Sequence, residues 1–555
     1  MIGKGGKEGR VGSGHAVPPE TEDMERMNVA ERGRIMRVGD FLKRYGKEIP
    51  DSEAIVFGDR RITFGQYDRE TDRVAMGLLN LGVRRGDRIG IYIPLWPEAL
   101  FIYLGAAKIG AVAVPVSVRT TAPELQFFAN DAEMSCLFLA SGFMGADFMG
   151  NLEAVRSGIP SLRHVVCLDR EKEGVLPYGR FLAEPDPSAL KRSTDAVREE
   201  DPVLFIYTSG TTGVPKAAML THKSVIAMTD AQLTATEFVH GDSLLLNLPL
   251  SHAGAAVMGV IATLNAGNKL VLMDMFNPEE TLRLIAAEKC TAMGQVPVMY
   301  AMELAHPNVG NYDLSSLKVP IVSAQPCPSE LILAFKQQVG VMPRNAYGLT
   351  EASGTVTFTH PDDGEEKLTY SVGRPVPSIQ LVLKDEEGNG VPRGEAGEIC
   401  IKGPVVMKGY WKRPEEDARV FDNDGFLHTG DMGRLEEDGY LVIVGRKKEM
   451  FIRGGENVYP PEIEEAICLH PDVMLAAVVG RPHEKWGEVG RAYIMPKPGR
   501  EITPEGMREF LKDRLSSFKI PEDFIIRPML PLTPLGKVKK LDLYAEMKDE
   551  YGNRP

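Results

Sequence analysis

DRIGIYIPLWPEALFIYLGAAKIGAVAVPVS, residues 87–117, predicts a β-strand, a helix and a second β-strand. Two short runs rich in Ile, Val and Ala flank the apolar segment that contains Phe101 and Leu104. Residues 99–116 contain Lys108 and two glycines and end near Pro115, which favours a buried helix and strand over a membrane span. Strands joined by a covering helix pack as parallel neighbours, so this stretch predicts an α/β fold.

The same alternation continues along the chain. PELQFFANDAE and CLFLA follow, and SLLLNLPL (243–250) and KLVLMDMF (269–276) repeat the strand pattern. From about residue 378, IQLVLKDEEGNGVPRGEAGEICIKGP places a Gly-Asn-Gly turn between two alternating runs, which predicts hairpins. A compact α+β pattern follows, with helices near 461–469 and 504–516 and strands at 474–480, 491–496 and 523–527.

We therefore expect a large N-terminal domain of helix-covered sheets with a small β-rich subdomain, hinged to a small α+β C-terminal domain. The expected boundaries are 1–36 for a disordered or loosely ordered N-terminal extension, 37–445 for the large domain, 378–445 for its β-rich part and 446–555 for the small domain. GRKKE, residues 445–449, is the expected joint.

Composition narrows the class of protein. The 555 residues carry a net charge of -13, which argues against nucleic acid as the main partner. Six cysteines lie far apart without a Cys-x-x-Cys pair, which indicates buried thiols in a reducing compartment. The N-terminus has no apolar signal-peptide core. We expect a cytoplasmic protein without a transmembrane segment, a monomer or homodimer, with peripheral membrane contact left open.

A second stretch, FIYTSGTTGVPKAAMLTH (205–222), concentrates glycine and hydroxyl side chains around a turn. PVLFIYT (202–208) predicts a buried strand, SGTTGVPK a strand-to-helix turn, and KSVIAMTDAQL the start of a helix. Backbone N–H groups, hydroxyls and the ammonium group of Lys216 suit a polyphosphate. The spacing differs from G-x-x-x-x-G-K-[ST], and a merely polar turn is the alternative.

Four further motifs occur in order: NAYGLTEAS (345–353), LHTGDMG (427–433), GRKKEMFIRGGENVYPPEIE (445–464) and PLTPLGKVKK (531–540). Together with the loop at 205–222, this set resembles the adenylate-forming superfamily of AMP-forming acyl-CoA synthetases, adenylation domains and beetle luciferases. The resemblance covers roughly residues 38–545. It implies two half-reactions: a carboxylic acid and ATP give acyl-AMP and pyrophosphate, and CoA then takes the acyl group and releases AMP. The cofactors and co-substrates so implied are ATP, Mg²⁺ and CoA, and the resemblance places the chain in fatty acid and lipid metabolism.

The resemblance also implies roles for individual residues. The loop would hold the ATP phosphates through Thr208, Ser209, Gly210, Thr211, Thr212, Gly213 and Lys216. Lys537 would bring the carboxylate and the α-phosphate together; a solvated lysine in a basic tail is its alternative. Thr350 would contact the α-phosphate and Glu351 would bind magnesium.

The nucleoside site would use four more positions. Tyr347 and Gly348 would lie against adenine, although ordinary core packing also explains an aromatic there. Asp431 would accept from the ribose hydroxyls, unless it only caps a turn. Arg446 would add a ribose contact, and Lys448 would be the pivot between the two half-reactions.

The second substrate site rests on the same resemblance. Gly454 and Gly455 match the loop that guides CoA, while Lys519 and Arg446 are weaker candidates for its phosphates and are also explained as surface charges. His252, in PLSHAGA, matches a position beside the carboxylate tunnel; a structural histidine is the alternative.

The chain departs from the family around the acyl pocket. SAQPCP (323–328) has Ala324 and Gln325 where glycines are common, and Ala346 stands where glycine is also common. These side chains remove tunnel volume, and a buried Gln needs a polar partner. We therefore expect a medium-chain, cyclic, aromatic or branched acid rather than a long-chain one, unless the tunnel opens elsewhere.

The expected function is an AMP-forming acyl-CoA ligase acting on a small-molecule carboxylic acid. An acyl-AMP ligase that loads a separate carrier protein is the alternative, and the GGENVYPPEIE segment favours CoA. A non-catalytic nucleotide- or acid-binding protein would be expected to lack Lys537 or Glu351, and both are present.

Overall fold

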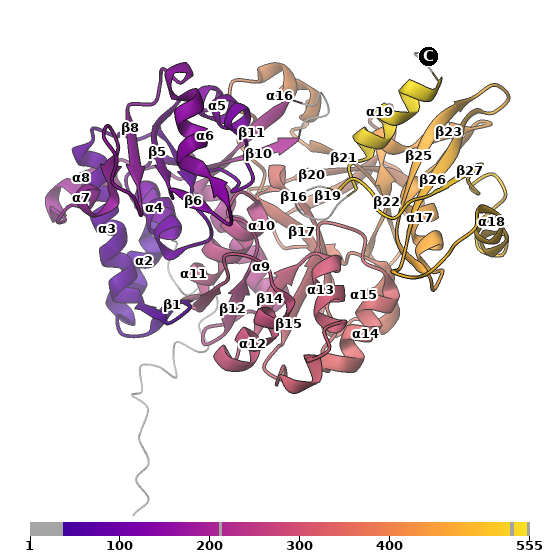
Figure 1. Ribbon diagram of the computed structural model, residues 1–555, viewed down its shortest axis with the longest axis horizontal. Helices are drawn as coiled ribbons and strands as arrows, with labels where there is room; N and C mark the ends of the chain where they lie inside the picture. Colours follow the sequence, from indigo (N-terminus) through magenta and orange to yellow (C-terminus); the bar gives the residue numbers. More distant parts are fainter. Residues whose placement is uncertain (1–36, 210–213, 533–537, 552–555) are drawn as a thin grey trace, which may run out of the picture.

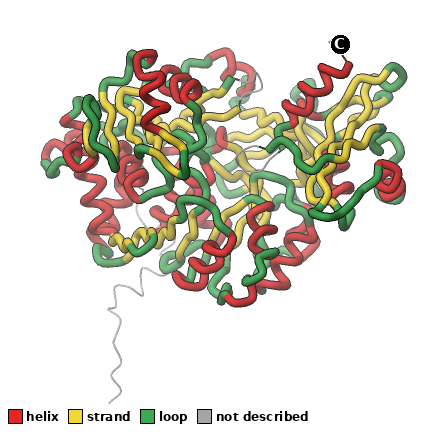
Figure 2. Tube along the Cα trace, in the orientation of Figure 1, coloured by secondary structure: helices red, strands yellow, loops and turns green. Residues whose placement is uncertain are grey.

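The computed structural model describes residues 37–209, 214–532 and 538–551 (Figure 1). These residues form a nine-, a seven-, a four- and a five-stranded sheet and one two-stranded ribbon. In Figure 2 the strands run through the interior of the N-terminal part, with helices outside them. The C-terminal elements, from β23 (Phe451–Arg453) to α19 (Lys540–Tyr551), lie to one side as a separate small domain (Figure 1).

The seven-stranded sheet contains the stretch at 87–117. β3 (Arg88–Tyr92) and β4 (Val112–Pro115) are parallel and are joined by α4 (Pro97–Lys108), so the expected strand–helix–strand unit is confirmed. Every residue of α4 except Glu98 is buried, and the ammonium group of Lys108 is satisfied by Asp68 and Asp72 at 2.5 and 2.6 Å. The other strands are β5 (Met134–Leu139), β8 (His164–Cys167), β9 (Leu176–Pro177), β10 (Pro202–Ser209) and β11 (Pro215–Thr221).

The nine-stranded sheet has a parallel centre. Its strands are β1 (Glu53–Phe57), β2 (Arg60–Thr63), β12 (Ser243–Leu246), β13 (Lys269–Leu272), β14 (Ala292–Gln295), β15 (Val319–Ser323), β16 (Arg344–Leu349), β17 (Gly354–Phe358) and β18 (Arg374–Pro375). The parallel strands β14, β15 and β16 end at one edge of the sheet, where binding sites form in open α/β sheets.

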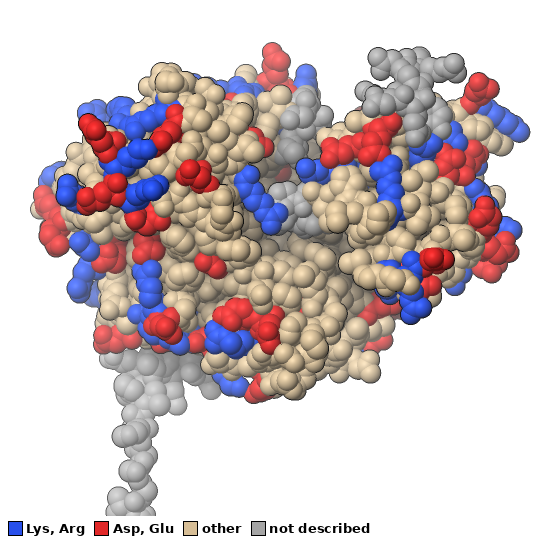
Figure 3. Space-filling view, in the orientation of Figure 1, with Lys and Arg blue, Asp and Glu red and all other residues tan. Residues whose placement is uncertain are grey.

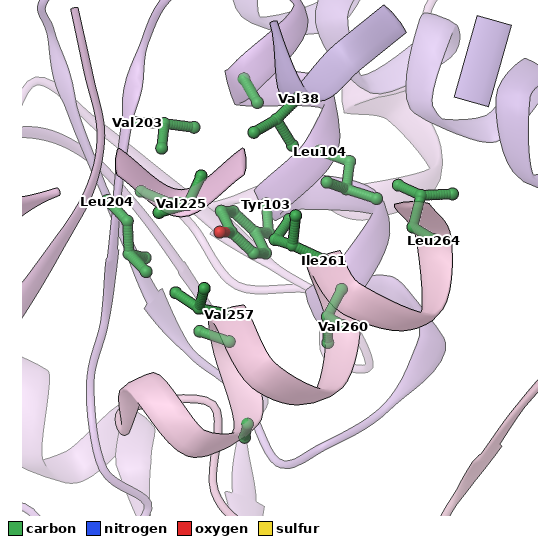
Figure 4. Packing of buried hydrophobic residues seen from close by; sticks show 14 of the residues in the cluster. Val38, Tyr103, Leu104, Val203, Leu204, Val225, Val257, Val260, Ile261 and Leu264 are labelled. Carbon is green, nitrogen blue, oxygen red and sulfur yellow. The ribbon is translucent and has the colours of Figure 1, made fainter. Parts of the chain in front are cut away.

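The main core lies between these two sheets (Figure 4). Tyr103 of α4 packs among Val225 of α9 (His222–Thr236), Val257 of the π-helical segment η3 (Ala256–Ile261) and Leu204 of β10. Burying each such apolar side chain contributes roughly 1.5–3 kcal/mol. The shared core holds the two sheets at a fixed spacing, so their loops meet at a defined place.

A four-stranded antiparallel sheet follows: β19 (Gln380–Lys384), β20 (Ala396–Lys402), β21 (Leu427–Leu435) and β22 (Leu441–Arg446). β19 and β20 pair as the Gly-Asn-Gly turn predicted. The small domain has β24 (Glu456–Val458), β25 (Val473–His483), β26 (Gly487–Pro496) and β27 (Asp523–Ile526), with α17 (Pro460–Cys468) and α18 (Pro504–Lys512). α18 is shorter than the predicted 504–516, because the chain turns at Asp513 before the turn-forming Ser516 and Ser517.

The remaining elements cover the sheets or connect them. They are α2 (Val38–Glu48), α3 (Phe64–Asn80), α5 (Ala122–Asp131), β6 (Gly142–Phe143), β7 (Ala146–Asp147), α6 (Phe148–Val155), η2 (Arg156–Gly158), α7 (Tyr178–Phe181), α8 (Pro187–Asp195), α10 (Ala253–Ala255), α11 (Ala262–Ala266), α12 (Pro278–Glu288), α13 (Pro297–Leu304), η4 (Val309–Asn311), α14 (Ser329–Val339), η5 (Thr350–Ala352), α15 (Glu365–Tyr370), α16 (Pro414–Val420) and η6 (Lys447–Glu449).

Within the described ranges, no helix has the length and apolar character needed to cross a bilayer. On the face drawn in Figure 3, acidic and basic side chains alternate over the N-terminal part, and much of the centre carries neither. That face shows no large patch of one charge.

Candidate active site

The nine-stranded and the four-stranded sheet meet at a pair of side chains, Tyr347 and Asp431. Tyr347 lies near the end of β16, and its hydroxyl donates to Asp431 Oδ2 at 2.8 Å. Asp431 lies in β21 and is buried, and Arg446, its register partner in β22, approaches Asp431 Oδ1 at 3.1 Å. Burial and then the charge of Asp431 raise the pKa of Tyr347 well above its ordinary value, so the phenol stays protonated. The carboxylate is therefore held by a phenol on one oxygen and by a guanidinium on the other.

The turn before Asp431 is built by local hydrogen bonds. Gly430 has a φ of +73°, a conformation that favours glycine, and the Asp431 N–H donates to Thr429 Oγ1 at 3.1 Å. The Gly430 N–H donates to Glu398 Oε1 on β20 at 3.1 Å. The Thr-Gly-Asp sequence thus forms a small turn whose own groups position the carboxylate.

Glu351 forms a second acidic centre. It lies in η5, directly after β16, and its Oε1 accepts from Tyr410 O–H at 2.8 Å and from Thr208 Oγ1 at 3.3 Å. Burial and then the charge of Glu351 raise the pKa of Tyr410. Thr350 adds a half-buried hydroxyl beside Glu351, and Gly348, between Tyr347 and this helix, is exposed.

These groups fit a magnesium site of the nucleotide-dependent kind. In the described part of the chain, no group of three or more His, Cys, Asp or Glu side chains gathers to bind a metal alone. Mg²⁺ commonly uses one or two protein carboxylates and completes its shell with water and substrate phosphates. Glu351, held by two hydroxyls, suits that role.

The glycine-rich stretch connects two antiparallel strands and not, as we expected, a strand and a helix. Thr208 and Lys216 are register partners in β10 and β11, which are antiparallel, and α9 begins only at His222. The short apolar run after Lys216, AAML, explains the second strand, because short continuous apolar runs are typical of buried strands. The backbone of Ser209 belongs to β10, whereas Gly210, Thr211, Thr212 and Gly213 lie outside the described residues.

Lys216 is buried at the root of this loop. Its Nζ lies 2.6 Å from Glu416 Oε2 of α16 and 4.6 Å from the centre of the Tyr410 ring. Tyr410 thus lies between a cation and an anion: its ring faces Lys216, and its hydroxyl donates to Glu351. Sequence reasoning missed Tyr410 and Glu416, because neither lies in a motif and each pairs with a residue far away in the chain.

The groups expected to act in the second half-reaction lie on the small domain and its joint. Gly454 and Gly455 form the two-residue turn between β23 and β24, with φ of +63° and +94°. The Gly454 N–H donates to the Trp486 carbonyl at 2.8 Å. Lys519 pairs with Glu462 at 2.6 Å, so binding CoA through Lys519 would require that pair to open. Lys448 lies in η6, and Lys537 lies outside the described residues.

The residues expected around the acyl group lie at the carboxyl ends of β15 and β16. Ala346 is buried and pairs with Ser323. Ala324 is exposed with a φ of +71°, and Gln325 is half-buried, so the expectation of a buried Gln is wrong. His252 is half-buried and lies at the start of α10, just before the π-helical η3, a type of element often found at functional sites.

Comparisons with known proteins point to the same family for both parts of the chain. Residues 42–411 match the family model described as AMP-binding enzyme, and residues 462–537 match AMP-binding enzyme C-terminal domain. The chain is 34% identical over 530 residues to a putative acyl-CoA synthetase of Bacillus subtilis, covering 91% of this chain and 96% of the relative. It is 31% identical over 537 residues to the mitochondrial medium-chain acyl-CoA ligase ACSF2 of Bos taurus, covering 92% of this chain and 87% of the relative.

A solved structure shows the same fold. The anthranilate CoA ligase AuaEII in complex with anthranoyl-AMP superposes with a TM-score of 0.83 at 25% identity, covering 93% of this chain and 98% of that one.

Proposed function

Since the chain belongs to the AMP-binding enzyme family, whose members similar to it are acyl-CoA synthetases and ligases, we propose that it converts a carboxylic acid, ATP and CoA to an acyl-CoA thioester, AMP and pyrophosphate. The observation that carries the proposal is the junction of three sheets at Tyr347, Asp431 and Glu351. It offers a flat aromatic face, a carboxylate for two ribose hydroxyls and a second carboxylate for a phosphate-bound cation.

In the first half-reaction, we assign the nucleoside to Tyr347 and Asp431, with Arg446 beside the ribose. The phosphates lie toward the β10–β11 loop, where Lys216 and Thr208 are positioned. Magnesium held by Glu351 would neutralise phosphate charge as the acid attacks the α-phosphorus. Lys537 is assigned the contact that brings the two anions together, and positioning of this kind accounts for most catalysis of phosphoryl chemistry.

In the second half-reaction, the CoA thiolate attacks the acyl carbonyl and AMP leaves. We assign the pantetheine path to the Gly454–Gly455 turn, because two exposed glycines let a thin chain approach the backbone. The small domain must then turn about Lys448 so that this turn replaces Lys537 at the site. We also propose that the large domain ends at residue 445 and the small domain begins at 446, and that the β-rich subdomain begins at 378.

The proposed acid is medium-chain, cyclic or aromatic and not long-chain. Ala346 is buried where β15 and β16 end, so its methyl group occupies volume beside the acyl site. Ala324 adopts a positive φ that glycine would adopt without strain, which indicates that a side chain was accepted there at some energetic cost. The name of ACSF2 specifies medium-chain acids and that of AuaEII an aromatic acid, in keeping with a compact pocket.

The test is mass spectrometry of products from ATP, magnesium, CoA and a panel of acids: octanoate, cyclohexanecarboxylate, benzoate, a cinnamate and palmitate. Thioester and AMP should form from the compact acids, and Lys537→Ala should lose both, while Lys539→Ala, changed two residues away in the same tail, should retain them. Acyl-AMP without thioester would favour the carrier-loading alternative. Palmitate as the best substrate by kcat/KM would refute the pocket argument while leaving the ligase activity intact.

A further inference from the structure

The joint between the two domains has an ion-pair cluster on each side of Lys448. We propose that Lys447 and Lys540 are positioning residues that confine the domain rotation to Lys448. Lys447, the residue before Lys448, is paired with the large domain. Lys540 pairs Glu449, the residue after Lys448, with the small domain. This inference rests on the proposed function in one respect, namely that the two half-reactions need two domain arrangements.

The first cluster belongs to the large domain. Lys447 Nζ lies 3.1 Å from Glu398 Oε2, and Glu398 is buried in β20. His428 Nδ1 lies 3.1 Å from the same oxygen, and Gly430 N–H donates to the other oxygen. Lys447 is therefore attached to a carboxylate that also holds the turn before Asp431, so the chain entering the joint is fixed to the nucleoside site.

The second cluster belongs to the small domain. Lys540 Nζ lies 2.8 Å from Glu449 Oε2 and 2.8 Å from Glu464 Oε1. Glu464 lies on α17, and Lys540 is the first residue of α19. The side chains of all three are largely buried, with 16–21% exposed. The two carboxylates outweigh the effect of burial and raise the pKa of Lys540, so the lysine stays charged.

Between these clusters, Lys448 is exposed, and among the described residues no carboxylate oxygen lies within 4.0 Å of its ammonium group. β22, which ends two residues before Lys448, contacts α17 of the small domain (Figure 1). The Arg446 carbonyl accepts from Met450 N–H at 3.1 Å, so η6 is a single short turn.

The two clusters restrict the backbone bonds about which the small domain can rotate without breaking an ion pair. A rotation before Lys447 would carry its side chain away with the small domain and break the pair with Glu398. A rotation after Glu449 would leave that carboxylate behind and break its contact with Lys540. Only a rotation at Lys448 keeps both pairs intact, so the domain follows one path between its two arrangements.

This arrangement also connects the joint to Lys537, the lysine assigned to catalysis, through the sequence. Lys540 comes three residues after Lys537 in the sequence, so the residue that holds Glu449 also starts the helix that follows the catalytic lysine. We expect loss of either cluster to spread the rotation over several residues and to make the arrival of Lys537 less exact.

The test measures the distance between spin labels on the two domains of the full chain, at Ser188→Cys in α8 and Glu505→Cys in α18, both exposed. Lys447→Met and Lys540→Met should each broaden the distance distribution by about twofold or more, because more bonds can turn. Lys540→Arg should restore the narrow distribution. The control is Lys512→Met, which removes the 2.5 Å pair with Glu509 inside α18 and should change nothing.

Pyrophosphate exchange and thioester formation from acyl-AMP are measured on the same variants. We expect the rate of the complete reaction to fall more than the rate of either half-reaction measured alone, because the variants impair the domain rotation between the two half-reactions. Unchanged distribution widths in both methionine variants would overturn the proposal, even if the enzyme proves to be a CoA ligase. Broadened widths without thioester in the wild type would support the joint and refute the ligase. If Lys540→Met fails to fold, Glu449→Gln tests the same contact.

Discussion

Replacing Tyr410 with phenylalanine tests how Glu351, the carboxylate that we assign to magnesium, is positioned. The Tyr410 hydroxyl donates to Glu351 Oε1 at 2.8 Å, and the side chain is buried. Phenylalanine keeps the ring that faces Lys216 at 4.6 Å, so the substitution removes the hydroxyl alone. The remaining donor to Glu351, Thr208 Oγ1, is farther away at 3.3 Å.

The expected loss follows from the kind of bond. A buried hydrogen bond to a charged group is worth about 1.5–3 kcal/mol, and about 1.4 kcal/mol corresponds to tenfold, so adenylation kcat/KM should fall roughly 10- to 100-fold. Because Glu351 is assigned to magnesium, the variant should need more Mg²⁺ for half-maximal rate, and saturating Mg²⁺ should recover part of the loss. A variant that was only misfolded would show no such recovery.

The assay is pyrophosphate exchange at a series of Mg²⁺ concentrations. Tyr312→Phe is the matched control, since it removes a hydroxyl that donates to Glu279 at 3.2 Å in a surface segment. It should leave both the rate and the Mg²⁺ dependence unchanged. A Tyr410→Phe enzyme with less than about threefold loss, or with an unshifted Mg²⁺ dependence, would refute the assignment of Glu351.

Three further predictions concern stability and the second half-reaction. Burial lowers the pKa of His222 to about 4 from 6.5, so the unfolded chain binds a proton that the folded chain does not. Stability should therefore fall by ~3 kcal/mol as pH drops from about 6.5 to about 4, and urea melts of His222→Asn should show a smaller slope in that window. Burial raises the pKa of Glu303 to about 8 from 4.5, so the opposite sign applies and stability is lost as pH rises from about 4.5 to about 8. Glu303→Gln should therefore be more stable than wild type at pH 8.5 by up to ~5 kcal/mol but not at pH 4.5. Gly454→Ala places a methyl group at positive φ and 3.0 Å from the Trp486 ring, so thioester formation from acyl-AMP should drop several-fold while pyrophosphate exchange is retained, and equal loss of both would contradict the assignment of this turn.

The sequence predicted the sheets better than the loops. Residues 87–117 show their strands and helix because burial on both faces leaves nearly continuous apolar runs, which are visible without a partner. The sequence analysis assigned no strand to residues 215–221, because the glycine-rich stretch before them and the helical pattern after them suggested a turn into a helix. The seven-residue strand β11 is identified by its antiparallel register with β10. The end of α18 was misplaced because helical propensity continues past Lys512 while the chain turns.

In the candidate site, the sequence predicted individual residues but not the contacts between them. Tyr347, Glu351 and Asp431 each lie in a short motif whose residue types already suit a nucleotide, so the sequence marked them. Their hydrogen bonds to one another, to Thr208 and to Tyr410 join residues 59 to 143 positions apart, and no local pattern indicates such pairs.

The sequence by itself determined the α/β class, the family and the residue types that we assign to the substrates, because apolar periodicity and short motifs are local properties of the chain. Only the tertiary structure decided that Glu416 pairs with Lys216, that Tyr410 supports Glu351, and that two ion-pair clusters flank Lys448. The physical reason is that these contacts form between side chains brought together by burial of the shared core, and the energy of such contacts depends on distances that arise only when the sheets have packed.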